Sequence, residues 1–364
     1  RPLFLLAAGF SSLALALWGL ALQGQQLSIM ELGTFWHSHE MLFGFAAAVI
    51  AGFLLTAVQN WTGRRATNGL PLLILTLVWL AGRVLMLFAP LVPWWLTALV
   101  DLAFLPLVAW VFWQLLYAVR QQRNYFFVPV LVLMTAVNAA MHWGNAHNNM
   151  GLVLWGSHAV SLMVVLLITI VGGRVMPMFT ANGTMTPKVE AIPWLEKSVL
   201  GGTWLVVAVF LTTLDQYLPA PVLAAVLIVV ALAQALRVAR WRIQVTWKVP
   251  LLWSLHLAYW CVPLGLLLLA LHYLGLPITF STALHTLTAG AIGGMILAMI
   301  ARVSLGHSGR RLEPHPLMAA GFALLLAAAL VRTLAVILWP AQTAVFYSVS
   351  ALLWVLAFAI FVVL

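Results

Sequence analysis

Long apolar runs, separated by short polar segments, fill almost the whole chain. Each run has about the 20 residues that an α-helix needs to cross the hydrocarbon core of a bilayer. We count about twelve of these runs and predict that each forms a membrane-spanning helix. The predicted spans are Leu3 to Leu22, His37 to Trp61, Leu70 to Ala89, Trp94 to Val119, Tyr125 to His142, Gly151 to Pro177, Trp194 to Leu214, Pro219 to Ala239, Pro250 to Tyr273, Thr279 to Val303, Pro316 to Trp339 and Thr343 to Leu364.

Lysine and arginine occur in alternate segments between the predicted spans. The basic segments contain Arg64 with Arg65, Arg120 with Arg123, Arg174 with Lys188, Arg237 to Lys248, and Arg302 to Arg311. Segments 23–35, 143–150 and 215–218 contain neither residue type. Because positively charged loops stay in the cytoplasm, we expect both termini to be cytoplasmic and the residues that begin the second span to face outward.

The composition supports a membrane protein and excludes several other classes. Of the 364 residues, 65% are hydrophobic and 7% are charged, against about 25% charged residues in soluble proteins. The net charge of +10 is explained by the basic loops, so it does not indicate a nucleic-acid partner. A single cysteine, Cys261, excludes an internal disulfide, a thiolate cluster and a CxxCH motif for covalent haem attachment. We therefore predict an all-α, polytopic integral membrane protein in which histidine, methionine, tyrosine or carboxylates bind any metal.

The second span begins with the motif WHSHEM, which brings together His37, His39 and Glu40. Two histidines that are two residues apart point about 200° away from each other on a regular helix. They cannot both face one metal unless the first turn is irregular. We predict His37 and His39 as metal ligands and Glu40 as a proton carrier or as a hydrogen-bonding partner of a ligand. Small residues that follow, such as Gly44 and Gly52, leave room either for a neighbouring helix or for a porphyrin.

The motif recurs later in the chain. When His39 is aligned with His285, Gly44 falls on Gly290 and the triplet at 62–64 falls on the triplet at 308–310, without a gap. A weaker match places His158 in the same series. We predict three related four-span units, 1–119, 120–240 and 248–364, and we add His158 and His285 to the candidate metal ligands.

Charged residues inside apolar spans need partners, because a charge at the centre of a span costs about 2.5–3.5 kcal/mol. Arg83 and Asp101 lie near the outer ends of two consecutive spans, and we expect them to form an ion pair. The alternative is that Arg83 or Arg332 holds an anionic group such as a haem propionate through its planar guanidinium. Arg332 has no acidic neighbour in the sequence, so it is the better candidate for this role.

Two further histidines lie inside spans or at their ends. His256 lies near the cytoplasmic end of the ninth span, so any metal that it binds belongs to a second site. His142 ends the fifth span on the outer side. We include both among the candidate metal ligands, although each also fits a histidine that only forms hydrogen bonds.

Several of these segments resemble the NnrS family of bacterial membrane proteins. The segments are WHSHEMLFGF, NWTGR, GGRVMPMFTAN, LLWSLHLAYW and HTLTAGAIGGMILAMIARVSLGHSGR. The resemblance covers nearly the whole chain and implies haem b and copper as cofactors, a link to nitric oxide metabolism, and a place in the bacterial inner membrane. It also implies that Arg174, Arg302 and His307, together with the histidines and Glu40, occupy the polar motif positions of the family.

The sequence leaves three functions open. In the first, the protein is an oxidoreductase that reduces nitric oxide with electrons from quinol or a separate donor. In the second, it is a non-enzymatic haem protein that binds or senses nitric oxide. In the third, it is a secondary transporter, as its many spans and intramembrane charges would also permit. We favour the first, with nitric oxide entering through the membrane lipid.

Overall fold

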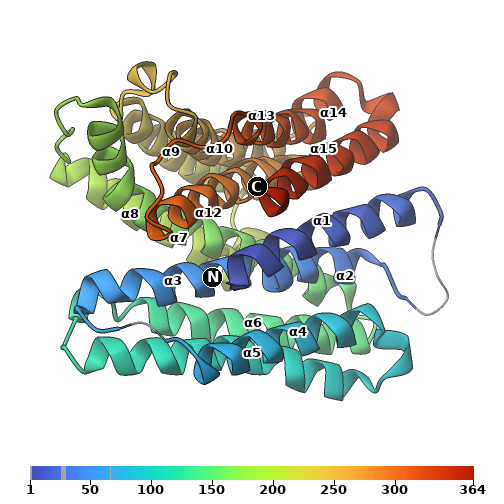
Figure 1. The fold of residues 1–364 in the computed structure, drawn as a ribbon. Coiled ribbons are helices and arrows are strands. Elements are labelled where there is room, and N and C mark those ends of the chain that lie inside the picture. Colours follow the sequence, from blue (N-terminus) through green and yellow to red (C-terminus); the bar gives the residue numbers. More distant parts are fainter. Residues whose placement is uncertain (1, 26–29, 66) are drawn as a thin grey trace. The chain divides into compact units, whose positions relative to one another are not determined.

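The computed structural model describes residues 2–25, 30–65 and 67–364 of the protein (Figure 1). This part of the chain is 83% helical and contains no strand. Twelve of its helical segments are long and apolar enough to cross a membrane. The predicted all-α, polytopic class is thereby confirmed.

The chain divides into two compact units, Arg1–Val160 and Ser161–Leu364. In the first unit, α1, α2 and α3 lie along one side and α4, α5 and α6 along the other (Figure 1), and α5 contacts α3, α4 and α6. The elements of this unit are α1 (Pro2–Leu22), α2 (Thr34–His39), η1 (Glu40–Ala46), α3 (Ala47–Thr62), α4 (Leu70–Leu87), η2 (Ala89–Leu91), α5 (Trp94–Tyr117), η3 (Gln122–Asn124) and α6 (Phe127–Ala146), and α7 (Met150–Thr184) begins in it.

In the second unit, α10 is the central helix, because it contacts α9, α11, α12 and α13. After α7 the elements are α8 (Pro193–Leu211), η4 (Leu214–Gln216), α9 (Ala220–Ala239), η5 (Ile243–Val245), α10 (Pro250–Tyr273), α11 (Phe280–His285), η6 (Thr286–Gly293), α12 (Gly294–His307), α13 (Pro316–Leu330), η7 (Val331–Ala335), α14 (Val336–Leu338), η8 (Pro340–Gln342) and α15 (Thr343–Val363).

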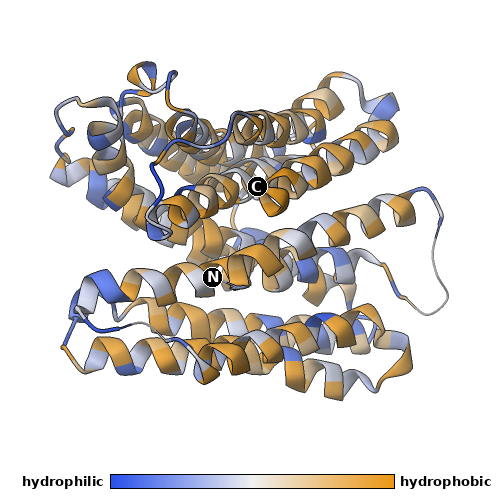
Figure 2. Ribbon diagram, viewed as in Figure 1, coloured by the Kyte–Doolittle hydropathy of each residue, from blue (hydrophilic) through white to orange (hydrophobic). Residues whose placement is uncertain are grey.

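The surface of the helices is apolar. Figure 2 shows hydrophobic residues along the helices and hydrophilic residues gathered near their ends and in the loops. Large apolar side chains are exposed at positions such as Leu77, Leu99 and Val229, with exposed fractions of 52%, 63% and 65%. A helix that is apolar on its outer face as well as its inner face is typical of a segment that lipid surrounds.

The sixth predicted span was wrong at its end. The predicted span ends at Pro177, whereas α7 continues to Thr184 with Pro177 inside it. A proline removes one backbone hydrogen bond, but membrane helices tolerate it because neighbouring groups satisfy the carbonyl that is left. Arg174 lies within α7, and Arg302 and His307 lie within α12.

The histidine motifs of the second and tenth spans have the same local structure. A six-residue α-helix ends at His39 in one and at His285 in the other, and a π-helix follows directly in both. Gly44 and Gly290, which the sequence aligns, both lie inside these π-helices. A π-turn inserts one residue into a helix and redirects the side chains beside it. This shared irregularity supports the alignment of the two motifs.

A network of hydrogen bonds that the sequence analysis missed stabilises the interior of the second unit. The Arg237 guanidinium on α9 donates to both carboxylate oxygens of Glu196, to the Thr169 carbonyl oxygen at 2.9 Å and to the Tyr259 hydroxyl at 3.0 Å. The Tyr259 hydroxyl in turn donates to Gln234 Oε1 at 2.8 Å. Because the buried cation has an acidic partner and its neighbours are paired, this network has a structural role.

We predict that Arg237→Ala lowers the stability of the protein by about 2 kcal/mol, because it removes a buried guanidinium and its hydrogen bonds to Tyr259 and to the half-buried Glu196. Thermal unfolding in detergent, followed by circular dichroism at one scan rate, measures the effect as a lower midpoint. Arg240→Ala is the matched control, since Arg240 stands at the C-cap of the same helix and donates to the Glu190 carbonyl oxygen at 3.3 Å. Equal midpoints for the two variants would contradict the structural role.

Candidate metal centre

His39 lies at the junction of α2 and η1 and is fully buried, with 0% of its surface exposed. Its Nε2 lies 3.0 Å from Asp101 Oδ2, and its Nδ1 lies 2.9 Å from Glu40 Oε1. Both ring nitrogens therefore face a carboxylate. A neutral imidazole has only one N–H group and can donate to only one of these carboxylates. The other contact therefore needs a second proton on the ring or a metal ion between the nitrogen and the carboxylate.

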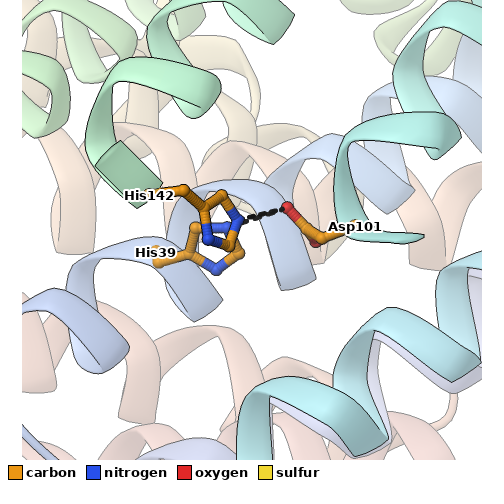
Figure 3. Close-up of side chains that lie close together, drawn as sticks. All are labelled: His39, Asp101 and His142. Atoms are coloured by element: carbon orange, nitrogen blue, oxygen red, sulfur yellow. Dashed lines mark hydrogen bonds and ion pairs between the residues drawn. The ribbon is translucent and has the colours of Figure 1, made fainter. Parts of the chain in front are cut away.

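His142 reaches the same carboxylate from α6. Its Nε2 lies 3.1 Å from Asp101 Oδ2, and Figure 3 shows the two imidazoles together beside Asp101. Asn138, one turn earlier on α6, donates its Nδ2 to the same oxygen at 2.7 Å. Asp101 itself is buried on α5, with 5% of its surface exposed. Side chains from two helices of the first unit, α2 and α6, thus converge on one carboxylate oxygen of α5.

Arg83 on α4 completes the cluster. Its Nη1 donates to Glu40 Oε1 at 2.5 Å, and its Nη2 forms an ion pair with Asp101 Oδ1. The expected Arg83–Asp101 ion pair is therefore present. A side chain at Gly44 could not share this space, because a Cβ there would lie 2.8 Å from Arg83 Nη1 and 2.7 Å from the Phe10 ring on α1. At both Gly44 and Gly52 the nearest atom to such a Cβ belongs to a phenylalanine of α1.

The charges of the cluster do not balance without a further cation. One guanidinium faces two carboxylates, Glu40 and Asp101, so with neutral histidines the buried group carries one negative charge. A buried charge that lacks a partner is costly. Either a proton on His39 or a metal ion held by its Nε2 supplies the missing positive charge.

Several buried polar atoms in and beside the cluster have no hydrogen-bond partner among the described residues. Three belong to the cluster itself, and two belong to residues close to it on the same helices. They are Glu40 Oε2, Arg83 Nε and Asn138 Oδ1, then Trp36 Nε1 and Thr97 Oγ1. Buried polar atoms are rarely left unpaired in native proteins, and an unpaired group indicates a bound water or ion.

The donor atoms of three residues are close enough together to hold a metal ion. The ligand atoms of His39, Asp101 and His142 lie within 4.8 Å of one another. Four donors placed tetrahedrally at about 2.0 Å from an ion are about 3.3 Å apart, close to the 3.0 and 3.1 Å that separate the imidazole nitrogens from Asp101. The contact of Glu40 with the other nitrogen of His39 is the usual support of a metal-binding histidine. Phe35 and Phe43 flank the His39 ring, with centroids 5.4 and 5.3 Å away, and make the surroundings apolar.

The other predicted residues of the first unit lie outside this group. His37 stacks on Trp18 of α1, with ring centroids 4.5 Å apart, so the two histidines of the WHSHEM motif point in different directions, as the helical spacing predicted. His158 is half-buried on α7.

In the second unit the predicted site residues do not form one cluster like that around Asp101. His285 Nδ1 lies 2.7 Å from the Ser281 carbonyl oxygen, and its Nε2 lies 3.4 Å from Arg332 Nη2. His256 is fully buried, and its Nε2 lies 2.9 Å from Thr180 Oγ1. The Arg302 guanidinium lies over the Phe179 ring, 4.0 Å from its centroid. Arg174 is half-buried and His307 is exposed.

From the sequence, Asp101 was predicted only as a partner of Arg83, and Asn138 was not predicted as part of a site. The sequence nevertheless indicates a larger role for Asp101 and a role for Asn138. An aspartate inside an apolar span needs several partners, and Asn138 stands one helical turn before His142, so both face the same neighbour.

The fold and the cluster define a class: a multi-pass membrane protein with a buried His–Asp–His group of the kind that binds a metal. The family model of the NnrS protein matches residues 1–364, the whole length of the chain. The protein therefore belongs to the NnrS family, which associates it with nitric oxide. No curated protein matches the chain, and neither does any solved structure.

We predict that His142→Ala lowers the affinity of the purified protein for Cu(II) by at least about 10-fold, since even loss of a group that only supports a ligand has an effect of this size. Asp101→Asn, which keeps the size of the side chain and removes its charge, should act in the same direction. Metal content after equilibrium dialysis against buffered Cu(II) measures both.

His147→Ala is the matched control for this measurement, because His147 is the C-cap of the same helix and contacts the Trp143 carbonyl oxygen at 2.9 Å. Affinities for copper that are equal in His142→Ala and in the unmodified protein would show that the metal is not bound at this group.

Proposed function

We propose that the protein converts nitric oxide at a metal centre inside the membrane, and that His39, Asp101 and His142 hold the metal. The observation that carries the proposal is the convergence of two imidazole nitrogens on one buried carboxylate, in a cluster that needs a further positive charge. Membership of the NnrS family supplies the link to nitric oxide.

Copper is the cofactor that this donor set favours. Imidazole suits copper, zinc and iron, and Cu(II) binds most tightly of the divalent first-row metals to a given set of nitrogen and oxygen ligands. A bound copper ion would supply the one-electron chemistry and the open coordination position that a reaction with nitric oxide needs. A porphyrin between the two imidazoles is not supported, because their ring centroids are only 4.9 Å apart.

The residues around the ion have separate tasks. Glu40 fixes the orientation of His39 through Nδ1, and Arg83 holds Glu40 and Asp101 in place through one guanidinium. Glu40 Oε2 has no described partner, so this oxygen is available to carry a proton. Reduction of two nitric oxide molecules to nitrous oxide and water consumes two protons and two electrons. Nitric oxide is small and apolar, so it reaches the site through the membrane lipid.

The electrons come from quinol or from a separate donor, because the chain has no covalent haem motif. The protein acts in the bacterial inner membrane, with both termini in the cytoplasm, as the alternation of basic loops predicts. Its role there is to remove nitric oxide under nitrosative stress.

Haem b is the second cofactor that we propose, with His256 and His285 in the second unit as its candidate ligands. Support for His256 comes from its Nδ1, which is buried and has no hydrogen-bond partner among the described residues. Arg302 and Arg174 are basic side chains of the same unit, and we retain them, together with His307, as candidate contacts of an anionic cofactor.

We predict that copper-loaded protein, supplied with an excess of ascorbate and a redox mediator as the source of electrons, consumes nitric oxide faster than the His39→Ala variant and releases nitrous oxide. His39→Ala should abolish the difference from buffer, because it removes a ligand and the contact with Glu40. Anaerobic incubation with nitric oxide, followed by an electrode and by gas chromatography, measures both gases, and His147→Ala serves as the control. Loss of nitric oxide without nitrous oxide would establish capture in place of turnover, and equal loss in all variants would sink the proposal.

A separate prediction concerns haem. If His256 or His285 binds the iron, His256→Ala or His285→Ala reduces the haem content of the purified protein by more than half, as pyridine haemochrome spectra measure. His315→Ala is the control, since the His315 side chain accepts a hydrogen bond from the Leu317 backbone at 3.3 Å and only caps α13. Full haem content in both variants would remove these two histidines as ligands.

A further inference from the structure

A second charged group lies in the second unit, around Arg332 in the π-helix η7. Its Nη2 donates to Ser281 Oγ at 3.2 Å and lies 3.4 Å from His285 Nε2. Its guanidinium carbon lies over the Tyr347 ring, 3.7 Å from the centroid. Each of these contacts is with a neutral group, and Arg332 joins none of the ion pairs found in the described part of the chain.

Two polar atoms, one in η7 and one at the start of η6, are buried without a hydrogen-bond partner among the described residues. They are Arg332 Nη1 and Thr286 Oγ1, on residues with 9% and 7% of their surface exposed. The hydroxyl follows His285 directly in the chain, and the guanidinium contacts His285. A buried guanidinium without a counter-ion is costly inside a membrane, and its unpaired N–H groups are suited to a carboxylate or a similar oxyanion.

The alignment of the two histidine motifs explains why the charge here is unbalanced. His39 aligns with His285, and Glu40 therefore aligns with Thr286, the first residue of the corresponding π-helix. In the first unit Glu40 and Asp101 pair with Arg83. In the second unit a threonine stands where the first of these carboxylates would be. The first group has an excess of negative charge, whereas the second has an excess of positive charge.

We propose that Arg332, Thr286 and Ser281 bind an anion with two or more acceptor oxygens, of the carboxylate or small oxyanion class. The Nη1 group of the guanidinium, which has no hydrogen-bond partner among the described residues, supplies N–H donors, and the two hydroxyls supply further ones. Ser281 is exposed, so the site can be reached from the surface of the protein. The inference concerns a different unit from the proposed copper centre and does not depend on it.

The first experiment compares Thr286→Glu with Thr286→Gln in the full-length protein. The two side chains have the same shape and differ in charge. Thr286→Glu supplies the anion from within the chain, so we expect a thermal midpoint several degrees above that of Thr286→Gln, and the advantage should disappear when Arg332→Gln is added. A midpoint of Thr286→Glu equal to or below that of Thr286→Gln would overturn the proposal.

The second experiment adds the ligand from outside. Sodium nitrite or sodium acetate replaces sodium chloride at constant ionic strength, and the midpoint should rise and saturate in the unmodified protein but not in Arg332→Gln. Arg240→Gln is the control for general effects of anions on surface arginines. A saturable response that depends on Arg332 identifies a dissolved anion as the ligand.

The carboxylate arm of a larger bound molecule has the same chemistry. In that case the unmodified protein does not respond to added anion, and native mass spectrometry shows a bound mass that Arg332→Gln lacks. No response and no bound mass that depends on Arg332 would overturn the proposal.

Discussion

The first unit depends on the cost of holding the Asp101 carboxylate inside a membrane protein. A carboxylate in the middle of a membrane span costs about 2.5–3.5 kcal/mol unless it is paired. Contacts with four side chains stabilise the buried Asp101 carboxylate: Arg83, His39, His142 and Asn138. These partners come from α4, α2 and α6, so a single charge determines how three other helical segments lie against α5. The arrangement that keeps the carboxylate in the protein is the same one that brings two imidazole nitrogens together.

The π-helix after His39 also helps to bring the polar groups of this cluster together. Regular helical spacing turns neighbouring side chains by about 100°, so His39 and Glu40 would diverge from a shared partner. A π-helix begins at Glu40, and Glu40 contacts both His39 and Arg83. Gly44 inside this π-helix leaves space for the Arg83 side chain. Local backbone irregularity and a missing side chain thus allow three charged or polar groups to meet in one place.

Much of the fold could be predicted from the sequence, because membrane spans are set by the length and hydropathy of single segments. The Arg83–Asp101 pair could also be predicted, since it joins consecutive helices. The group of His39, Asp101 and His142 was harder to predict, because its contacts join residues 62 and 41 positions apart and depend on which helices pack together. His37 shows that closeness in the sequence does not predict closeness in the site. It lies two residues from His39 in the motif, but its ring stacks on Trp18. The continuation of α7 beyond Pro177 was missed because the groups that compensate for a proline belong to other helices.

The two histidine motifs show how one framework produces opposite electrostatic demands. Each has a short α-helix that ends at a histidine and a π-helix that follows it. Each is also contacted by an arginine from a later segment, Arg83 of α4 in the first motif and Arg332 of η7 in the second. Glu40 at the start of one π-helix and Thr286 at the start of the other change the charge of the surroundings while the backbone stays the same. Around His39 the carboxylates outnumber the guanidinium, which calls for a cation. Around His285 the guanidinium has only neutral contacts among the described residues, which calls for an anion. Because a buried charge is tolerated only with a partner, two differences together decide the kind of ligand that each motif is suited to bind. One is the side chain at this position, and the other is Asp101, which pairs with Arg83 but has no acidic counterpart at Arg332 among the described residues.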